Sequence, residues 1–201
     1  MLLDASEGSI REGALIGCTI QHTHEAPGSA NVRLIGRADE PHKVGHFCIS
    51  DNAMSDVAIN IELRHARGVV ITGNTLWKGF EHNLLAENCS NLVLGPGAFD
   101  RNPDYRPADS ANTLVFRDCR DSTLSGLHIN HTLGEPAALV LERCQRFQVT
   151  GCTILDCAPA GLLLREVRNS RVSGCLIRSD LPDTQSRPVV VEGGAGNTIE
   201  P

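Results

Sequence analysis

The stretch Glu142–Cys157, ERCQRFQVTGCTILDC, places three cysteines around a glycine within sixteen residues. Similar stretches recur along the chain, as VVITGNTLW at 69–77, STLSGLHIN at 122–130 and NSRVSGCLIRSD at 169–180. The glycine before each C/N-x-I element is separated from the next by 28, 28, 22, 31, 25, 23 and 22 residues, which is the spacing of a repeat architecture. The marker glycines are Gly17, Gly45, Gly73, Gly95, Gly126, Gly151, Gly174 and Gly196.

Each repeat also contains a short aliphatic run before the marker, such as TLVFRDC at 113–119 or ALVLERC at 138–144. Shorter runs lie on either side of the glycine, and all of them alternate in polarity. No repeat has an apolar stripe at helical spacing. Three strand-like pieces per repeat, with no helix, predict an all-β solenoid of about eight coils. Aromatic residues make up only 3% of the chain, so we expect an aliphatic interior.

The motifs G-N-T-L at Gly73–Leu76 and G-N-T-I at Gly196–Ile199, with their G-C-x-I variants, carry a resemblance to a known architecture. Over about Ile10 to Ile199, the chain resembles the right-handed parallel β-helix superfamily, which is the pectate-lyase-like architecture. A leucine-rich repeat is the alternative, but its L-x-x-L-x-L spacing is not reproduced. We therefore expect residues 1–201 to form one right-handed parallel β-helix domain, as part of a longer chain.

Stacked coils place equivalent residues above one another, so columns can be compared. The residue seven before the marker is small and apolar, with Cys89 included after a one-residue deletion. The members of this column are Ala66, Cys89, Cys119, Cys144 and Val167. The residue after the marker occupies a corner that, in the resembling architecture, commonly holds an inward asparagine ladder. The members of this second column are Cys18, His46, Asn74, Cys152, Cys175 and Asn197.

The cysteines in these columns have a simple interpretation, because a buried free cysteine behaves as a small hydrophobic residue. A zinc site needs four converging ligands, whereas a column offers neighbours in a line. A disulfide needs a torsion near 90°, which parallel side chains reach with difficulty. A catalytic thiol needs exposure and a nearby base, and only Cys157 lies at a loop.

A further column predicts a structural feature on the outer surface. Its charges alternate in sign over six repeats, two residues before the small apolar column, and strand alternation points these residues outward. We expect a ladder of opposite charges on one exposed sheet face, since a cation beside a carboxylate lowers its pKa and disfavours a general-acid role. The ladder contains Arg64, Glu87, Arg117, Glu142, Arg165 and Glu192.

Chemistry is expected where loops gather on one side of a solenoid. The loops that follow the marker strand in the third to fifth repeats hold the only Trp, the only Tyr and several charged residues. The predicted catalytic residues are Lys78, Asp100, Asp104 and His131, and the predicted substrate-binding residues are Trp77, His82, Arg101 and Tyr105. The alternative is a proline-stiffened surface loop with solvated histidines. No metal site is predicted, although His22, His24 and Glu25 lie together on an earlier loop.

The resemblance implies a carbohydrate-active protein, similar to polysaccharide lyases or glycoside hydrolases, with a groove formed by these loops. A polysaccharide or oligosaccharide is then the expected partner; the cofactor stays open, with calcium as the candidate. The alternative is a non-catalytic structural, adhesive or oligomer-forming module, because the open ends of a β-helix expose unpaired strands that caps or partner chains would cover.

Charge and hydropathy exclude other partners. The net charge of −6 predicts no nucleic-acid partner, and no run approaches the ~18 apolar residues of a membrane span. The first residues do not resemble a signal peptide. The compartment stays open, with a secreted or periplasmic location expected only where a longer parent chain carries a leader.

Overall fold

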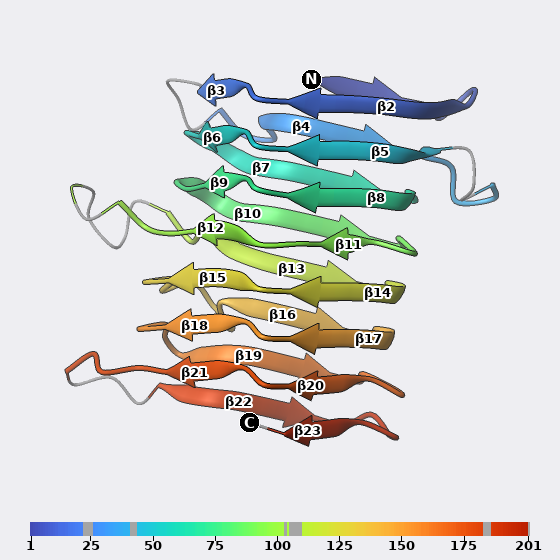
Figure 1. The fold of residues 1–201 in the computed structure, drawn as a ribbon. Helices are drawn as coiled ribbons and strands as arrows, with labels where there is room; N and C mark the ends of the chain where they lie inside the picture. The colour runs from blue at the N-terminus through green and yellow to red at the C-terminus, as the bar shows by residue number, and fades with distance from the viewer. Residues whose placement is uncertain (22–25, 41–43, 103, 105–109, 183–185, 201) are drawn as a thin grey trace.

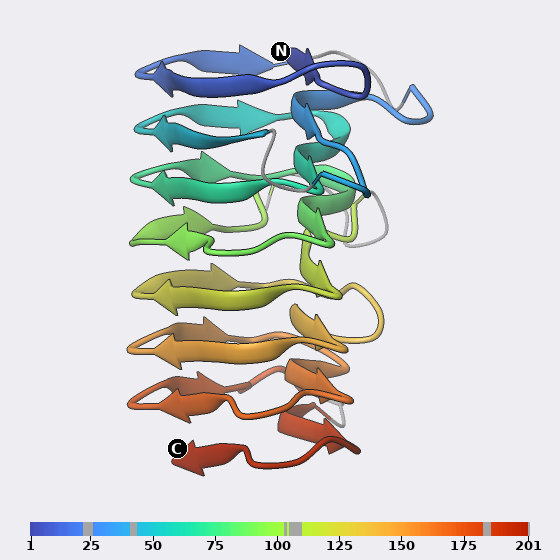
Figure 2. The same cartoon turned by 90° about the vertical axis from the view of Figure 1, so that its right-hand side faces the viewer.

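The computed structural model describes residues 1–21, 26–40, 44–102, 104, 110–182 and 186–200. The chain winds through three parallel sheets, and its coils stack one upon another from β1 to β23 (Figure 1). Figure 2 shows the same stack from the side, with the N-terminus in the first coil and the C-terminus in the last. None of the described residues lies in a helix, so none forms a helix that could span a membrane. The predicted all-β parallel solenoid is confirmed.

We call the three sheets A, B and C in the order in which each coil passes through them. Sheet A contains β1 (Leu2–Asp4), β4 (Ala30–Ile35), β7 (Val57–Arg64), β10 (Gly79–Glu87), β13 (Thr113–Arg117), β16 (Leu139–Glu142), β19 (Ala160–Arg165) and β22 (Arg187–Glu192). Sheet B contains β2 (Ile10–Ile16), β5 (Val44–Ser50), β8 (Arg67–Thr72), β11 (Val93–Leu94), β14 (Arg120–Ser125), β17 (Gln145–Thr150), β20 (Arg171–Ser173) and β23 (Thr198–Glu200). Sheet C contains β3 (Thr19–Gln21), β6 (Ala53–Ser55), β9 (Thr75–Leu76), β12 (Gly97–Phe99), β15 (Leu127–Asn130), β18 (Thr153–Leu155) and β21 (Leu176–Arg178).

The alternation in each strand separates an interior from an outer face. On β13, Leu114 and Phe116 belong to the interior cluster, whereas Val115 belongs to a second apolar cluster outside sheet A. The interior is mostly aliphatic, as expected, and its Phe116 and Phe147 rings meet edge to face with centroids 5.8 Å apart. In sheet B only one face is buried, so a one-residue slip would reverse every side chain and the hydrophobic pattern fixes the register there.

The charge ladder predicted from the sequence is confirmed by the register. Arg117 pairs with Glu87 on one side and with Glu142 on the other, and Arg165 pairs with Glu142 and Glu192. The side chains form ion pairs along the column, with Arg117 3.2 Å from Glu87 and 3.3 Å from Glu142. The column runs along the edge of sheet A that leads into sheet B.

The marker glycines explain the corner between sheets B and C. Gly73, Gly126 and Gly151 have φ between 60° and 68°, a left-handed conformation that glycine adopts without strain. In the second coil Ser50 pairs with Thr72, so the residue equivalent to Gly73 is Asp51, which has φ 58°.

Two of the predicted markers are wrong, and a third is displaced. Gly45 lies at the start of β5 beside Arg67, so His46 is not in the asparagine column. Thr198 pairs with Arg171, which places Gly196 opposite Asn169 and Asn197 opposite Ser170, at a different corner. Ala98 pairs with Thr75, so Gly97, and not the residue after Gly95, occupies the Asn74 position. Glycine serves left-handed turns at more than one corner, and the sequence motif does not distinguish them.

The asparagine ladder itself occupies two coils at the B–C corner. Asn52 donates to Asn74 Oδ1 at 2.9 Å and to the Leu15 carbonyl at 2.9 Å, and its own Oδ1 accepts from the Cys18 amide. Cys152 and Cys175 occupy the same column in later coils, as predicted. All eight cysteines are free thiols.

A second asparagine ladder, not predicted, lies at the corner between sheets C and A. Asn31 donates to Asn60 Oδ1, and Asn60 donates to Asn83 Oδ1, each at 2.8 Å. All three side chains are buried, and they also bond the carbonyls of the corner: Asn31 bonds Ser55 at 3.0 Å and Asn60 bonds Trp77 at 3.0 Å. This ladder fixes the backbone on which the predicted site residues lie.

Candidate functional site

The C–A corner of the third to fifth coils gathers most of the predicted site residues. Leu76 pairs with Phe99, and Phe99 pairs with Ile129, so the residues that follow these strands stack coil on coil. The first column of the corner contains Trp77, Asp100 and Asn130, and the second contains Lys78, Arg101 and His131. Neighbours within a column are separated by one coil, about 4.8 Å. Long connections leave the solenoid at this corner, on the left in Figure 1.

Lys78 is held in place by an acidic partner that the sequence did not reveal. Its ammonium lies 3.1 Å from Asp56 Oδ1 and 5.7 Å from the centre of the Phe80 ring, and its side chain is 17% exposed. Burial opposes the charge on Asp56, but hydrogen bonds from Ser55 and Lys78 outweigh it and hold the Asp56 pKa below its usual range. The carboxylate form of Asp56 is therefore favoured, and the contact holds the Lys78 side chain in a fixed position.

A polar chain links the fourth coil to the fifth. Asp100 Oδ1 accepts from its neighbour Arg101's backbone amide at 2.7 Å and from Asn130 Nδ2 at 3.3 Å. Asn130 Oδ1 in turn lies 3.4 Å from His131 Nδ1. Asp100 is exposed, whereas His131 is half-buried. These groups offer a carboxylate, an amide and an imidazole on one short stretch of surface.

The remaining predicted residues are not part of this group. Asp104 is exposed, and its backbone amide is bonded to Asn102 of the same loop. Tyr105 lies outside the described residues, as do His22, His24 and Glu25 of the earlier loop.

His82 lies on β10, directly before Asn83 of the buried ladder. Its Nδ1 is 2.6 Å from Thr113 Oγ1. Burial and the charge of Arg117 lower the pKa of His82 to about 4, so the ring is neutral near pH 7. Glu62 and Glu87 also lie close enough to affect it. A half-buried, neutral imidazole bonded to a threonine is suited to a structural role on sheet A.

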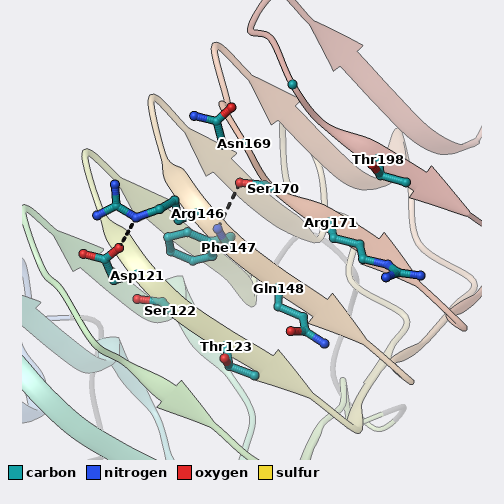
Figure 3. Close-up of a pocket in the computed structure, with 11 residues that line it drawn as sticks. Asp121, Ser122, Thr123, Arg146, Phe147, Gln148, Asn169, Ser170, Arg171 and Thr198 are labelled. Atoms are coloured by element: carbon teal, nitrogen blue, oxygen red, sulfur yellow. Dashed lines mark hydrogen bonds and ion pairs between the residues drawn. The ribbon is translucent and has the colours of Figure 1, made fainter.

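A separate hollow lies on the face of sheet B. It has a volume of about 520 Å³ and lies over β14, β17, β20 and β23 (Figure 3). An ion pair between Asp121 and Arg146 lies on the left of the view, with Arg171 and Thr198 on the right and Gln148 below. None of the eight predicted site residues lines it.

The described part of the chain was also compared with the predictions for metal ligands and for partner residues. Among the described residues, no group of three or more His, Cys, Asp and Glu side chains could hold a metal ion. Sequence reasoning missed Asp56 and Asn130. A register extended from one coil to the next would have placed Asn130 beside Asp100, because both lie at the end of a short strand of sheet C.

Known proteins give limited comparisons. An alginate lyase from Paenibacillus sp. str. FPU-7 superposes with a TM-score of 0.41 at 10% identity, covering 84% of this chain and 78% of that one. A protein from Parabacteroides merdae ATCC 43184, provisionally named a glycosyl hydrolase, superposes with a TM-score of 0.36 at 12% identity, covering 84% and 80%. At these scores the likeness carries no argument about activity. No family model matches the sequence, and no curated protein matches it.

Proposed function

We propose that the protein is a carbohydrate-active solenoid that binds an acidic polysaccharide along the C–A corner of its third to fifth coils. The observation that supports this is the column of three basic residues, Lys78, Arg101 and His131, on consecutive coils. The same column continues to Asp56 in the coil before and to Asp156 in the coil after, so its basic section is limited to these three coils. Repeated basic groups at a regular spacing suit a polymer with a carboxylate on each sugar.

The neighbouring column supplies the other contacts that a sugar needs. Trp77 provides an aromatic face, and aromatic side chains combine a large apolar surface with a polar edge. Asp100 and Asn130 are bonded to each other and offer acceptors and donors for sugar hydroxyls. Trp77 is half-buried, so it would contact the polymer through one edge or face.

Cleavage of the polymer is the finer part of the proposal. As a lyase, the protein would use His131 as the base, with Arg101 and Lys78 offsetting the uronate charge. As a hydrolase, it would use Asp100 and Asp104 as its two carboxylates. The ion pair with Asp56 favours a charge-offsetting role for Lys78 over a role as base. Tyr105 would then contribute only to substrate binding, and His82 would support sheet A through its bond with Thr113.

The test is binding and depolymerisation with matched variants. Wild-type protein is titrated with alginate, polygalacturonate and a neutral glucan, with and without calcium, and products are assayed for unsaturated uronates and for new reducing ends. We expect binding to the two uronate polymers, at least about tenfold weaker in Arg101→Ala, since a charge-assisted contact contributes about 1.5–3 kcal/mol. Arg171→Ala, on sheet B and away from this corner, is the matched control.

The outcomes separate the parts of the proposal. Unsaturated products indicate a lyase, and reducing ends alone indicate a hydrolase. Binding without products supports a non-catalytic sugar-binding module. If none of the polymers binds, or if Arg171→Ala weakens binding as much as Arg101→Ala, the corner is not a polysaccharide site.

A further inference from the structure

The alternating ladder on sheet A is complementary in charge to a reversed copy of itself. Its six members run plus, minus, plus, minus, plus, minus from Arg64 to Glu192. When the ladder is turned end to end, the sign at every position is inverted. We infer that this edge of sheet A is an interface with a second copy of the chain, related by a two-fold axis perpendicular to the solenoid. This surface is separate from the C–A corner and independent of the sugar-binding proposal.

The two-fold arrangement places opposite charges together throughout. With the axis between Arg117 and Glu142, each Arg117 faces a Glu142 of the other copy. Moving outward along the ladder, Glu87 faces Arg165, and Arg64 faces Glu192. All six positions of each copy are then matched, and the interface is isologous, as in most homodimers.

The central pair of the next column along the chain is matched by the same axis. Asp118 and Arg143 directly follow Arg117 and Glu142, and their side chains are 40% and 50% exposed. Within one chain they are 2.8 Å apart, and across the axis each would face its counterpart in the other copy. The outer positions of this second column are His65, Asn88, Glu166 and Gly193, so only its central pair adds to the match.

The same pattern excludes other arrangements. Two copies side by side in the same direction and in register would place like charges together in every coil. A slip of one coil in the antiparallel arrangement would also bring like charges together at each position. Like-charge contacts disfavour these two alignments. A parallel pair shifted by one coil would match five positions and an antiparallel pair shifted by two coils would match four, so the unshifted antiparallel pair has the most matched positions.

The size of the surface sets the strength of association. From Arg64 to Glu192 the ladder spans five coil steps, about 24 Å at about 4.8 Å each. A strip two columns wide and of this length falls short of the roughly 800 Å² per partner that stable complexes bury. The ladder side chains are 18–47% exposed, so salt can screen them. We therefore expect a weak dimer that dissociates at high ionic strength.

Charge-swap variants test the interface directly. In Arg117→Glu, two carboxylates face each other at both central positions, and in Glu142→Arg two cations do so. Each variant alone should associate at least about tenfold more weakly than wild type in sedimentation equilibrium at low salt. An equimolar mixture should recover dimers, because the carboxylate introduced in one chain then faces the guanidinium introduced in the other. The unchanged Glu142 of the first chain also faces the unchanged Arg117 of the second.

The mixture also separates association from folding. Either substitution disturbs the ladder within its own chain, but a second chain cannot repair such a defect unless it binds. Should these variants unfold, Asp118→Arg and Arg143→Asp form an equivalent pair on more exposed side chains. Arg171→Glu, on sheet B, is the control and should associate like wild type. A wild type that stays monomeric at low salt and millimolar concentration, or a mixture no more dimeric than its components, overturns the inference.

Discussion

Asn60 offers the sharpest test of what holds the C–A corner in place. Its side chain is fully buried and makes three hydrogen bonds: it accepts from Asn31 at 2.8 Å and donates to Asn83 at 2.8 Å and to the Trp77 carbonyl at 3.0 Å. Asn60→Ala withdraws all three. A buried polar group deprived of its partner costs about 1–3 kcal/mol, and with two or three such groups we expect a loss of roughly 3–5 kcal/mol.

The matched control for Asn60 is Asn197, near the other end of the solenoid. Asn197 accepts from the Ser170 amide at 3.0 Å and donates to the Val167 carbonyl at 2.7 Å, but it is half-buried. Water can replace its bonds, so Asn197→Ala should cost about 1 kcal/mol or less.

Urea denaturation followed by circular dichroism and by Trp77 fluorescence measures both free energies. Coincident transitions and an unchanged m-value justify the comparison. Equal losses in the two variants would refute the reasoning, because burial of the ladder would then contribute nothing beyond the hydrogen bonds themselves. The fluorescence of Trp77 should also change in Asn60→Ala, since the lost bond holds that residue's carbonyl.

Three further predictions concern the corners, a histidine and the thiols. In Gly151→Ala the new Cβ would meet no atom within 4 Å, so the free energy of unfolding should fall by about 1–2 kcal/mol from the left-handed backbone alone. Gly73→Ala should be less stable still, because its Cβ would collide with Asp51 Oδ1. Equal shifts of the melting temperature in the two variants would contradict this. Burial lowers the pKa of His82 to about 4, so its stabilising contribution is complete above pH ~6.5 and falls by up to about 3 kcal/mol toward pH 4. His82→Gln should flatten the plot of unfolding free energy against pH over this range. An unchanged slope would argue against the assignment. In the native protein, iodoacetamide should alkylate Cys175 well before Cys144, as followed by mass spectrometry. A hydrogen bond with Cys152 lowers the pKa of Cys175 to about 6, whereas the neighbour Cys119 and burial raise the pKa of Cys144. Comparable alkylation rates would show that burial does not protect Cys144.

The sequence predicted those features that depend on strand alternation. The charge ladder was placed correctly in all six of its coils, because each of these strands of sheet A ends in a charged residue. The small apolar column was also correct: Cys119 and Cys144 are buried within it. In both cases each residue's environment follows from its neighbours in the strand.

Corners and loops were harder, because their backbone follows no period. Asp51 takes a glycine's place in the second coil, so the search for glycine moved that coil's marker to Gly45. The stacking of Lys78, Arg101 and His131 was foreseen only as a shared side of the fold. The partner of Lys78, Asp56, comes from the coil before, and such a contact appears only once the register between coils is known.

The alternating ladder also constrains how this solenoid can change in length. Each coil contacts chiefly the coils next to it, so deleting or duplicating one would leave the sheets intact. Loss of the coil that contains Glu142, however, would bring Arg117 beside Arg165, and duplication of any single coil would place two equal charges together. Only changes by two coils preserve the order of signs. The repeating unit of the structure is one coil, but the repeating unit of its electrostatics is a pair.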